Sequence, residues 1–371
     1  MTNESRWIED LSTLLLDVND LVLVLDDVGL DSFMDELIAD VRSSIGGLDP
    51  ANVETHRRAG FSYDHPEPGM IEWMPTMLQG DIVSVKTVGY HPGNPRKRRV
   101  SSVLATTAIY DTDSGALVAL TEATLLTALR TGAVSAAVTD AVTPDAPIVL
   151  GVVGCGSQAV TQIHAISRVR QISQLVVTDI DLTIAETLGS RLPAGIAKPE
   201  IHPSRSFNRL VDAFDVLVTA TSVGLGDGPV VDLTKAADHL HINAVGADFP
   251  GKTELPADYV RQAVVIPDFV DQCLVQGEAQ CLQASELGPD IVEVLSRDWD
   301  SLSNQQTIFD STGWAYEDLI ATRLFLTHAI RLGLGRSAQL QRVPQDPYDP
   351  YESVRSSKAL RPDGQTLHNR S

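Results

Sequence analysis

The sequence predicts an α/β protein in which a Rossmann-type, doubly wound parallel sheet is inserted into a discontinuous α+β domain. After residue 147, short apolar runs alternate with helix-length segments, which is typical of a parallel sheet covered by helices. Before residue 120, β-rich pieces punctuated by Gly and Pro indicate a second, antiparallel or mixed sheet. The chain has 371 residues, more than one hydrophobic core normally serves, so two domains are expected.

In the first part of the chain, the apolar run at 21–25 is expected to form a strand that leads into a helix over 30–45. Further strands are expected at 82–88 and 103–110, where β-branched residues are frequent. The Ala- and Leu-rich segment 122–142 predicts one long helix that joins the two domains.

The strands of the parallel sheet are expected at 148–153, 175–178, 216–219, 240–244, 264–266 and 307–309. A last helix over 315–332 is long enough to return to the first domain. The predicted division therefore assigns 1–128 and 322–345 to the α+β domain, 129–321 to the Rossmann domain, and 346–371 to a tail. That tail is rich in Pro, Asp, Ser and Arg and is expected to be disordered.

Charge and composition exclude several classes of partner. The formal net charge of −21 would repel a phosphate backbone, so no nucleic-acid partner is expected. The longest apolar runs are broken by charge before they reach the length of a membrane span, and no targeting segment is expected, which makes the cytoplasm the expected location. The three cysteines have no metal-ligand spacing, so neither a disulfide framework nor a metal site is expected.

A glycine-rich turn follows the first strand of the parallel sheet. Gly154-x-Gly156-x-x-Ala159 after an apolar strand and before a helical run is the phosphate-binding turn of a dinucleotide fold. The turn presents backbone N–H groups of a helix N-terminus to the pyrophosphate. Asp179, 25 residues after Gly154, ends the next apolar run and is suited to the ribose 2′-hydroxyl. Because an acid there repels a 2′-phosphate, NAD is favoured over NADP.

Five ordered segments resemble the ornithine cyclodeaminase and mu-crystallin family, with the related archaeal-type alanine dehydrogenases, from about residue 20 to about 335. They are 71–75, 85–92, 128–132, the glycine turn and 245–255. Asp248 and the stretches 276–280 and 309–313 are more similar to the cyclodeaminase branch. An insert at 61–69 departs from the family pattern, and it is expected to form a loop that borders the substrate.

The resemblance implies residues that hold an α-amino acid. Its carboxylate would be bound by Lys86, Arg130 and one of Arg57 and Arg58, because guanidinium groups match a planar carboxylate. Spacing does not decide between the two neighbouring arginines. Met74 is implied as a further substrate contact.

The resemblance also implies the catalytic residues Asp248, Lys86 and Glu72. Asp248 follows an apolar strand at its carboxyl end, where ligands bind in doubly wound sheets, and is the first choice for the acid or base. Glu72 would help to hold the substrate amines. The cofactor contacts implied are Ser102, Arg130, Gly154, Gly156, Ser157, Gln158, Asp179, Thr221, Ala244, Gly246, Lys252 and Ser311.

The function implied is that of an NAD-dependent cyclodeaminase acting on a basic amino acid, ornithine to proline or lysine to pipecolate. Hydride would pass from Cα to the nicotinamide, the side-chain amine would close the ring, ammonia would leave, and the hydride would return. A homodimer is implied as well. Two alternatives stay open: a net amino-acid, opine or cyclic-imine oxidoreductase with the same site, and a non-enzymatic, mu-crystallin-like ligand-binding protein.

Overall fold

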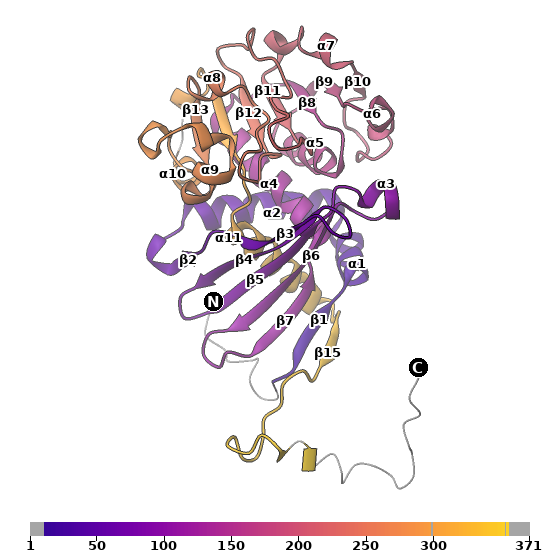
Figure 1. Cartoon of the computed structure of the whole chain (residues 1–371), viewed down its shortest axis with the longest axis vertical. Coiled ribbons are helices and arrows are strands. Elements are labelled where there is room, and N and C mark those ends of the chain that lie inside the picture. The colour runs from indigo at the N-terminus through magenta and orange to yellow at the C-terminus, as the bar shows by residue number, and fades with distance from the viewer. Residues whose placement is uncertain (1–10, 298–299, 353, 356–371) are drawn as a thin grey trace.

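The computed structural model describes residues 11–297, 300–352 and 354–355, which form two sheets joined by long helices (Figure 1). The first sheet has the strand order β15-β1-β7-β6-β5-β4-β2, with β3 paired to β4. Its strands are β1 (Thr13–Leu16), β2 (Val53–Thr55), β3 (Ala59–Tyr63), β4 (Gly69–Leu78), β5 (Ile82–Tyr90), β6 (Val103–Asp111), β7 (Leu117–Glu122) and β15 (Arg336–Ala338). These strands are mainly antiparallel, and β1 and β7 pair in parallel.

The second sheet has the order β10-β9-β8-β11-β12-β14-β13, and all of these neighbours pair in parallel. Its strands are β8 (Ile148–Val153), β9 (Ile172–Thr178), β10 (Pro199–Ile201), β11 (Val216–Thr219), β12 (His241–Ala244), β13 (Val264–Pro267) and β14 (Thr307–Asp310). Every residue of β11, β12 and β14 is buried, as expected for strands covered on both faces. The predicted doubly wound α/β fold is confirmed.

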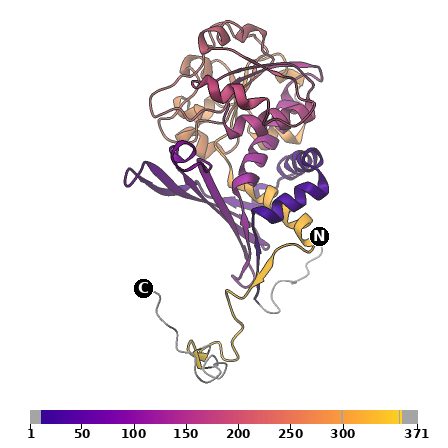
Figure 2. The same ribbon diagram turned by 90° about the vertical axis from the view of Figure 1, so that its right-hand side faces the viewer.

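The helices lie between and around the two sheets. They are α1 (Val18–Val28), α2 (Leu30–Gly46), α3 (Asn94–Arg98), α4 (Thr124–Val142), α5 (Ser157–Val169), α6 (Leu182–Leu188), α7 (Ser204–Phe207), α8 (Ala257–Val260), α9 (Val270–Gln276), α10 (Ile291–Ser296) and α11 (Ala315–Arg331). The two sheets occupy opposite ends of the molecule, with α2, α4 and α11 between them (Figure 1, Figure 2).

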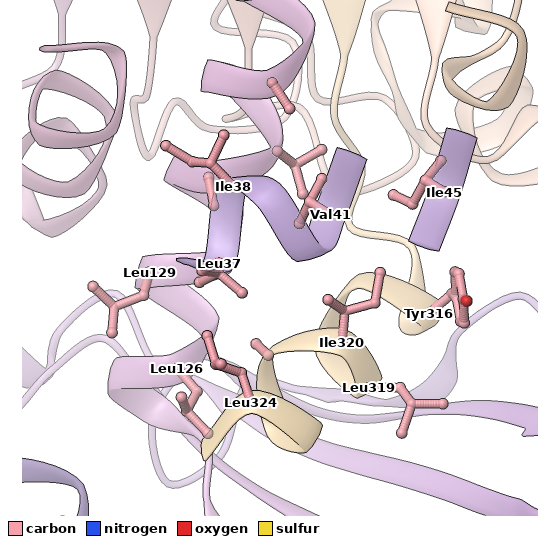
Figure 3. Close-up of a cluster of buried hydrophobic side chains, with 14 of the residues drawn as sticks. Leu37, Ile38, Val41, Ile45, Leu126, Leu129, Tyr316, Leu319, Ile320 and Leu324 are labelled. Carbon is pink, nitrogen blue, oxygen red and sulfur yellow. The ribbon is translucent and has the colours of Figure 1, made fainter. Parts of the chain in front are cut away.

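The main hydrophobic core lies where α2, α4 and α11 meet (Figure 3). It contains side chains from all three helices: Leu37, Ile38, Val41, Ile45, Leu126, Leu129, Leu319, Ile320 and Leu324. Each such side chain stabilises the fold by about 1.5–3 kcal/mol when fully buried. α4 is long and apolar enough to cross a membrane by composition, but 72% of that stretch is buried inside the protein, so it is a core helix.

The strand predicted at 21–25 is wrong, because this run belongs to α1. Asp17 caps the helix: its carboxylate accepts backbone N–H bonds from the first turn, and the Asp20 carboxylate accepts one from the Asp17 N–H at 2.8 Å. Leu21 and Val24, three residues apart, are the buried members of the run. The apolar run was too short for its period to separate strand from helix.

The helix predicted over 122–142 and the strands predicted from 82 to 110 and from 148 to 309 are confirmed, apart from shifts at their ends. The insert at 61–69 is a strand and turn rather than a loop, since β3 pairs with β4 along its length. β15 brings the chain back to the first sheet, where it pairs antiparallel with β1. The domain boundaries predicted at 128/129 and 321/322 fall inside α4 and α11, and they stay predictions. The predicted tail, 346–371, lies largely outside the described residues.

Candidate active site

The glycine-rich turn lies between β8 and α5. Gly154 has a φ of 90°, and a Cβ added to it would lie 2.6 Å from the carbonyl oxygen of Ala220, so a larger residue does not fit there. Gly156 precedes α5 without a side-chain cap, and a Cβ added to it would meet nothing within 4 Å. The start of α5 is therefore uncapped and open at Gly156, as a pyrophosphate site requires. Ser157, exposed, and Gln158, half-buried, begin the helix.

Asp179 stands directly after β9, next to this turn. Its two carboxylate oxygens accept backbone N–H bonds from Cys155 at 2.7 Å and from Asp181 at 2.8 Å. These bonds fix the acid beside the glycine turn, where a ribose diol can reach it. Turn, uncapped helix start and acid together fit a dinucleotide with a free 2′-hydroxyl. The three cysteines are free, and Cys155 and Cys273 are buried.

The other predicted cofactor contacts lie mainly at the carboxyl edge of the parallel sheet. Thr221 follows β11, Gly246 follows β12 with Ala244 as its last residue, and Ser311 follows β14. The Ser311 hydroxyl is buried, and no described residue forms a hydrogen bond with it. Ser102 belongs to the other half of the molecule, immediately before β6.

Lys86 and Arg130 form a buried basic cluster with two acids of α11. Lys86 Nζ lies 2.6 Å from Asp318 Oδ2, and Arg130 Nε lies 2.8 Å from Asp318 Oδ1. Arg130 Nη1 also lies 2.7 Å from Glu317 Oε2. No side chain of the four is more than 5% exposed. β5, α4 and α11 therefore meet at one buried charged cluster.

Burial sets the protonation equilibria of this cluster. It lowers the pKa of Lys86 to about 8, against the opposing effect of Asp318, and raises the pKa of Glu317 to about 8, against the opposing effect of Arg130. Burial also acts to raise the pKa of Asp318, but the two cations prevail and hold it below its usual value. Asp318 is thus the permanent counter-ion, while Lys86 and Glu317 titrate near neutral pH.

The two neighbouring arginines differ in burial. Arg57 is exposed, whereas the Arg58 side chain is 8% exposed and lies 3.4 Å from Glu72. The Arg58 guanidinium also donates to the carbonyl oxygens of Thr312 and Gly313. A Cβ added to Gly313 would lie 3.0 Å from guanidinium nitrogens of both Arg58 and Arg130, so the two cations converge at this glycine.

Glu72 and Met74 share the inner face of the first sheet with Lys86. Met74 is the direct cross-strand partner of Lys86, and Glu72 lies two residues before Met74 on β4, so the three side chains point to the same face. Burial raises the pKa of Glu72; Arg58 opposes the shift, and Asp248 adds to it. Glu72 lies on β4 of the first sheet and Asp248 in the loop after β12 of the parallel sheet, so the two acids come from different sheets.

Asp248 stands at the open side of the site, in the loop after β12. Its side chain is 48% exposed, and its Oδ1 lies 3.0 Å from Lys252 Nζ. Lys252 is itself nearly buried and lies 5.9 Å from the ring centroid of Tyr90 at the end of β5. An accessible acid held by a buried cation can exchange protons with a ligand while keeping its position.

The two buried acids of α11, Glu317 and Asp318, were not predicted from the sequence. They are adjacent carboxylates followed directly by the apolar residues Leu319, Ile320 and Ala321, and that contrast was the available signal. Among the described residues, no group of three His, Cys, Asp or Glu side chains is arranged to hold a metal ion. The candidate site contains three cations that suit a carboxylate, Arg58, Lys86 and Arg130, and two acids that suit amines, Glu72 and Asp248.

A sequence profile of the ornithine cyclodeaminase/mu-crystallin family matches residues 18–330. This chain belongs to that family. Within the family it is 37% identical to the L-lysine cyclodeaminase of Streptomyces rapamycinicus over 344 residues, which cover 92% of this chain and 99% of the relative.

Two solved structures extend the comparison within the ornithine cyclodeaminase/mu-crystallin family. One is a lysine cyclodeaminase studied for its recognition of L-lysine, L-ornithine and L-2,4-diaminobutyric acid, with a TM-score of 0.88 and 38% identity over 92% of this chain and 99% of that one. The other is an archaeal alanine dehydrogenase dimer with bound NAD, with a TM-score of 0.77 and 27% identity over 89% of this chain and all of that one, 100%.

Proposed function

We propose that this protein is an NAD-dependent cyclodeaminase that converts a basic diamino acid into a cyclic amino acid and ammonia, ornithine to proline or lysine to pipecolate. One observation carries the proposal: the buried cations Arg58 and Arg130 converge at Gly313, and Lys86 shares the counter-ion Asp318 with Arg130. Two acids accompany these cations, Glu72 at 3.4 Å from Arg58 and the half-exposed Asp248. Such a site has places for one carboxylate and two amines, which is the charge pattern of a diamino acid.

The three cations Arg58, Lys86 and Arg130 would orient the substrate by binding its α-carboxylate. Arg58 and Arg130 converge at Gly313, and Lys86 enters the same cluster from β5. Bound there, the α-carboxylate would place Cα above the inner face of the first sheet, toward the carboxyl edge of the parallel sheet. NAD⁺ held at the glycine turn would supply a reversible hydride acceptor for Cα.

The acids then control the protons. Asp248, exposed enough to reach a ligand, would accept a proton from the distal ammonium. The freed amine would attack Cα after loss of its hydride has made it an iminium carbon, and the ring would close. Loss of ammonia would leave a cyclic iminium, and the hydride would return to this carbon. Glu72 would hold the α-amino group and supply the proton with which it leaves as ammonia. Burial raises the pKa of Glu72, which favours the protonated form that can donate a proton.

The relatives support this substrate class. The Streptomyces relative is a lysine cyclodeaminase, and the solved cyclodeaminase binds three diamino acids that differ in side-chain length. The substrate proposed here is therefore a diamino acid of this series.

The test is to incubate the purified protein with a small amount of NAD⁺ and single diamino acids. Ammonia release without accumulation of NADH supports the proposal, and the Asp248→Asn variant should release ammonia at least about 100-fold more slowly. If NADH forms in proportion to the amino acid consumed, the reaction is a net oxidation and not a cyclodeamination. That second candidate is favoured by the likeness to the alanine dehydrogenase, whose substrate carboxylate the same cations could hold.

We propose a homodimer as the assembled form. The outer face of the first sheet exposes large apolar side chains, among them Ile71 at 43%, Trp73 at 37% and Leu104 at 49%. Such a patch on a folded chain marks an interaction surface. Light scattering should give the mass of a dimer for the wild type and the mass of a monomer for Trp73→Lys. A monomer mass for the wild type at micromolar concentration would contradict this surface.

A further inference from the structure

Three buried acids lie behind the cofactor edge of the parallel sheet, and no step of the proposed reaction uses them. Glu254, Glu278 and Asp310 are each at most 1% exposed. We infer that they form one nested clamp, in which Asp310 binds the backbone at Glu278, Glu278 binds the backbone at Glu254, and Glu254 binds the loops after β11 and β12. This clamp positions both loops, and with them the cofactor and Asp248. The inference rests on the proposed cofactor and is independent of the amino acid that the protein converts.

The first clamp is Glu254. Its Oε1 accepts the N–H of Thr221 at 2.7 Å, and its Oε2 accepts the N–H of Gly246 at 2.9 Å. Thr221 and Gly246 stand two residues beyond the ends of the neighbouring strands β11 and β12. A Cβ added to Gly246 would lie 2.4 Å from the Glu254 carboxyl group, so the glycine is needed for this contact. One carboxylate thus ties together the two loops that border the cofactor site.

The second clamp holds the first. Glu278 Oε1 accepts the N–H of Glu254 at 2.6 Å, and Glu278 Oε2 accepts the N–H of Leu255 at 3.1 Å. The backbone that carries the first carboxylate is therefore fixed by a second one. Burial and the nearby Glu254 raise the pKa of Glu278, while the two N–H groups oppose the shift.

The third clamp is Asp310, which fixes the backbone that carries Glu278. Asp310, the last residue of β14, accepts the N–H of Glu278 and the N–H of Ala279, both at 2.9 Å. A Cβ added to Gly277 would lie 2.3 Å from Asp310 Oδ2, so a glycine is again needed. Because Asp310 precedes Ser311, both ends of the nested clamp stand beside predicted cofactor contacts.

All six bonds use backbone N–H groups, and each carboxylate engages with both oxygens. An amide in place of a carboxylate keeps the shape but turns one acceptor into a donor that faces another donor. Glu278→Gln therefore breaks the middle clamp without touching the cofactor. The loops that Glu254 ties would then lose their fixed spacing, which is what a bound dinucleotide needs.

The matched control is Asp215→Asn. Asp215 also accepts a backbone N–H of the same sheet, that of Val149 at 2.7 Å, but at the opposite, amino edge. NADH affinity is measured by fluorescence titration without amino acid, together with the thermal midpoint of each protein. We expect Glu278→Gln to bind NADH at least tenfold more weakly and Asp215→Asn to bind it within twofold of wild type.

Equal NADH affinity of Glu278→Gln and wild type would overturn the inference and leave the proposed function intact. A wild type that binds no NADH would instead overturn the proposed cofactor, and the inference with it. If Glu278→Gln does not fold, hydrogen exchange on the wild type decides. NADH should slow exchange of the amides of 254–255 and 278–279 at least tenfold, and unchanged exchange there would overturn the inference.

Discussion

Asp318 Oδ2 lies 2.6 Å from Lys86 Nζ, and both side chains are nearly inaccessible to solvent. The same carboxylate reaches Arg130 with its other oxygen. A buried anion between two cations makes the cluster stable without a ligand, and it fixes both cations for a substrate carboxylate.

Removing the charge of Asp318 should damage the fold more than removing that of Glu317. Asp318→Asn leaves two buried cations without their shared counter-ion, and we expect a loss of about 3–5 kcal/mol in the free energy of unfolding. Burial raises the pKa of Glu317 to about 8, so Glu317→Gln imitates the form present at pH 7 and should cost about 1 kcal/mol. Urea unfolding of both variants measures the difference, and equal losses would contradict it.

Substrate affinity should fall as the pH rises through about 8. Burial lowers the pKa of Lys86 to about 8, so its ammonium is lost above that pH, and with it one donor to the carboxylate. The folded pKa is below the unfolded value, so burial of Lys86 destabilises the fold below pH 8, and this penalty declines between about pH 8 and 10.5.

The pH profile of kcat/KM for Lys86→Arg tests this assignment. Arginine stays charged, so the alkaline limb near pH 8 should disappear in that variant. Glu317 titrates in the same range, and Glu317→Gln is therefore the control that should retain the limb. Loss of the limb in Glu317→Gln, with retention in Lys86→Arg, would assign it to the carboxyl group instead.

Arg58, and not its neighbour, should bind the substrate carboxylate. Arg58→Ala removes a buried guanidinium beside Glu72 and should lower kcat/KM about 100-fold, in line with the loss of charged hydrogen bonds. Arg57 is exposed, and Arg57→Ala should stay within about threefold of wild type. Steady-state kinetics with one diamino acid compares the two, and a larger effect at Arg57 would reverse the assignment.

Asp179 should set the preference for NAD over NADP. Asp179→Asn removes the charge that would repel a 2′-phosphate, and we expect the ratio of NADPH to NADH affinity to rise about tenfold. Asp181, which caps α6 two residues later, provides the control: Asp181→Asn should leave the ratio unchanged. Fluorescence titration with both reduced cofactors measures the ratios, and an unchanged ratio in Asp179→Asn would remove the acid from ribose recognition.

Much of the parallel sheet and the glycine turn could be predicted because their signals are local. A buried strand, Gly154, Gly156 and Asp179 stand within about thirty residues, and each has its own steric or electrostatic reason. The burial of Arg58, in contrast to the exposure of Arg57, does not follow from local sequence. It depends on Gly313, more than 250 residues away, whose missing side chain makes room for the guanidinium.

Buried acids were the main omission, because a carboxylate in sequence is expected on the surface. Asp318 and Glu278 are buried because cations or backbone N–H groups from distant segments compensate them. The strands β1 and β15 were missed for a related reason. Each has only three or four residues, and they form strands by pairing with each other across the whole chain.

The fate of the Cα hydrogen tests the proposed cyclodeamination most directly. With ornithine or lysine deuterated at Cα and catalytic NAD⁺, hydride transfer and return on one bound molecule should give a cyclic product that keeps deuterium at the same carbon, with one ammonia released per product. Deuterium recovered in accumulating reduced cofactor, with a product that has none, would show net oxidation and contradict the account.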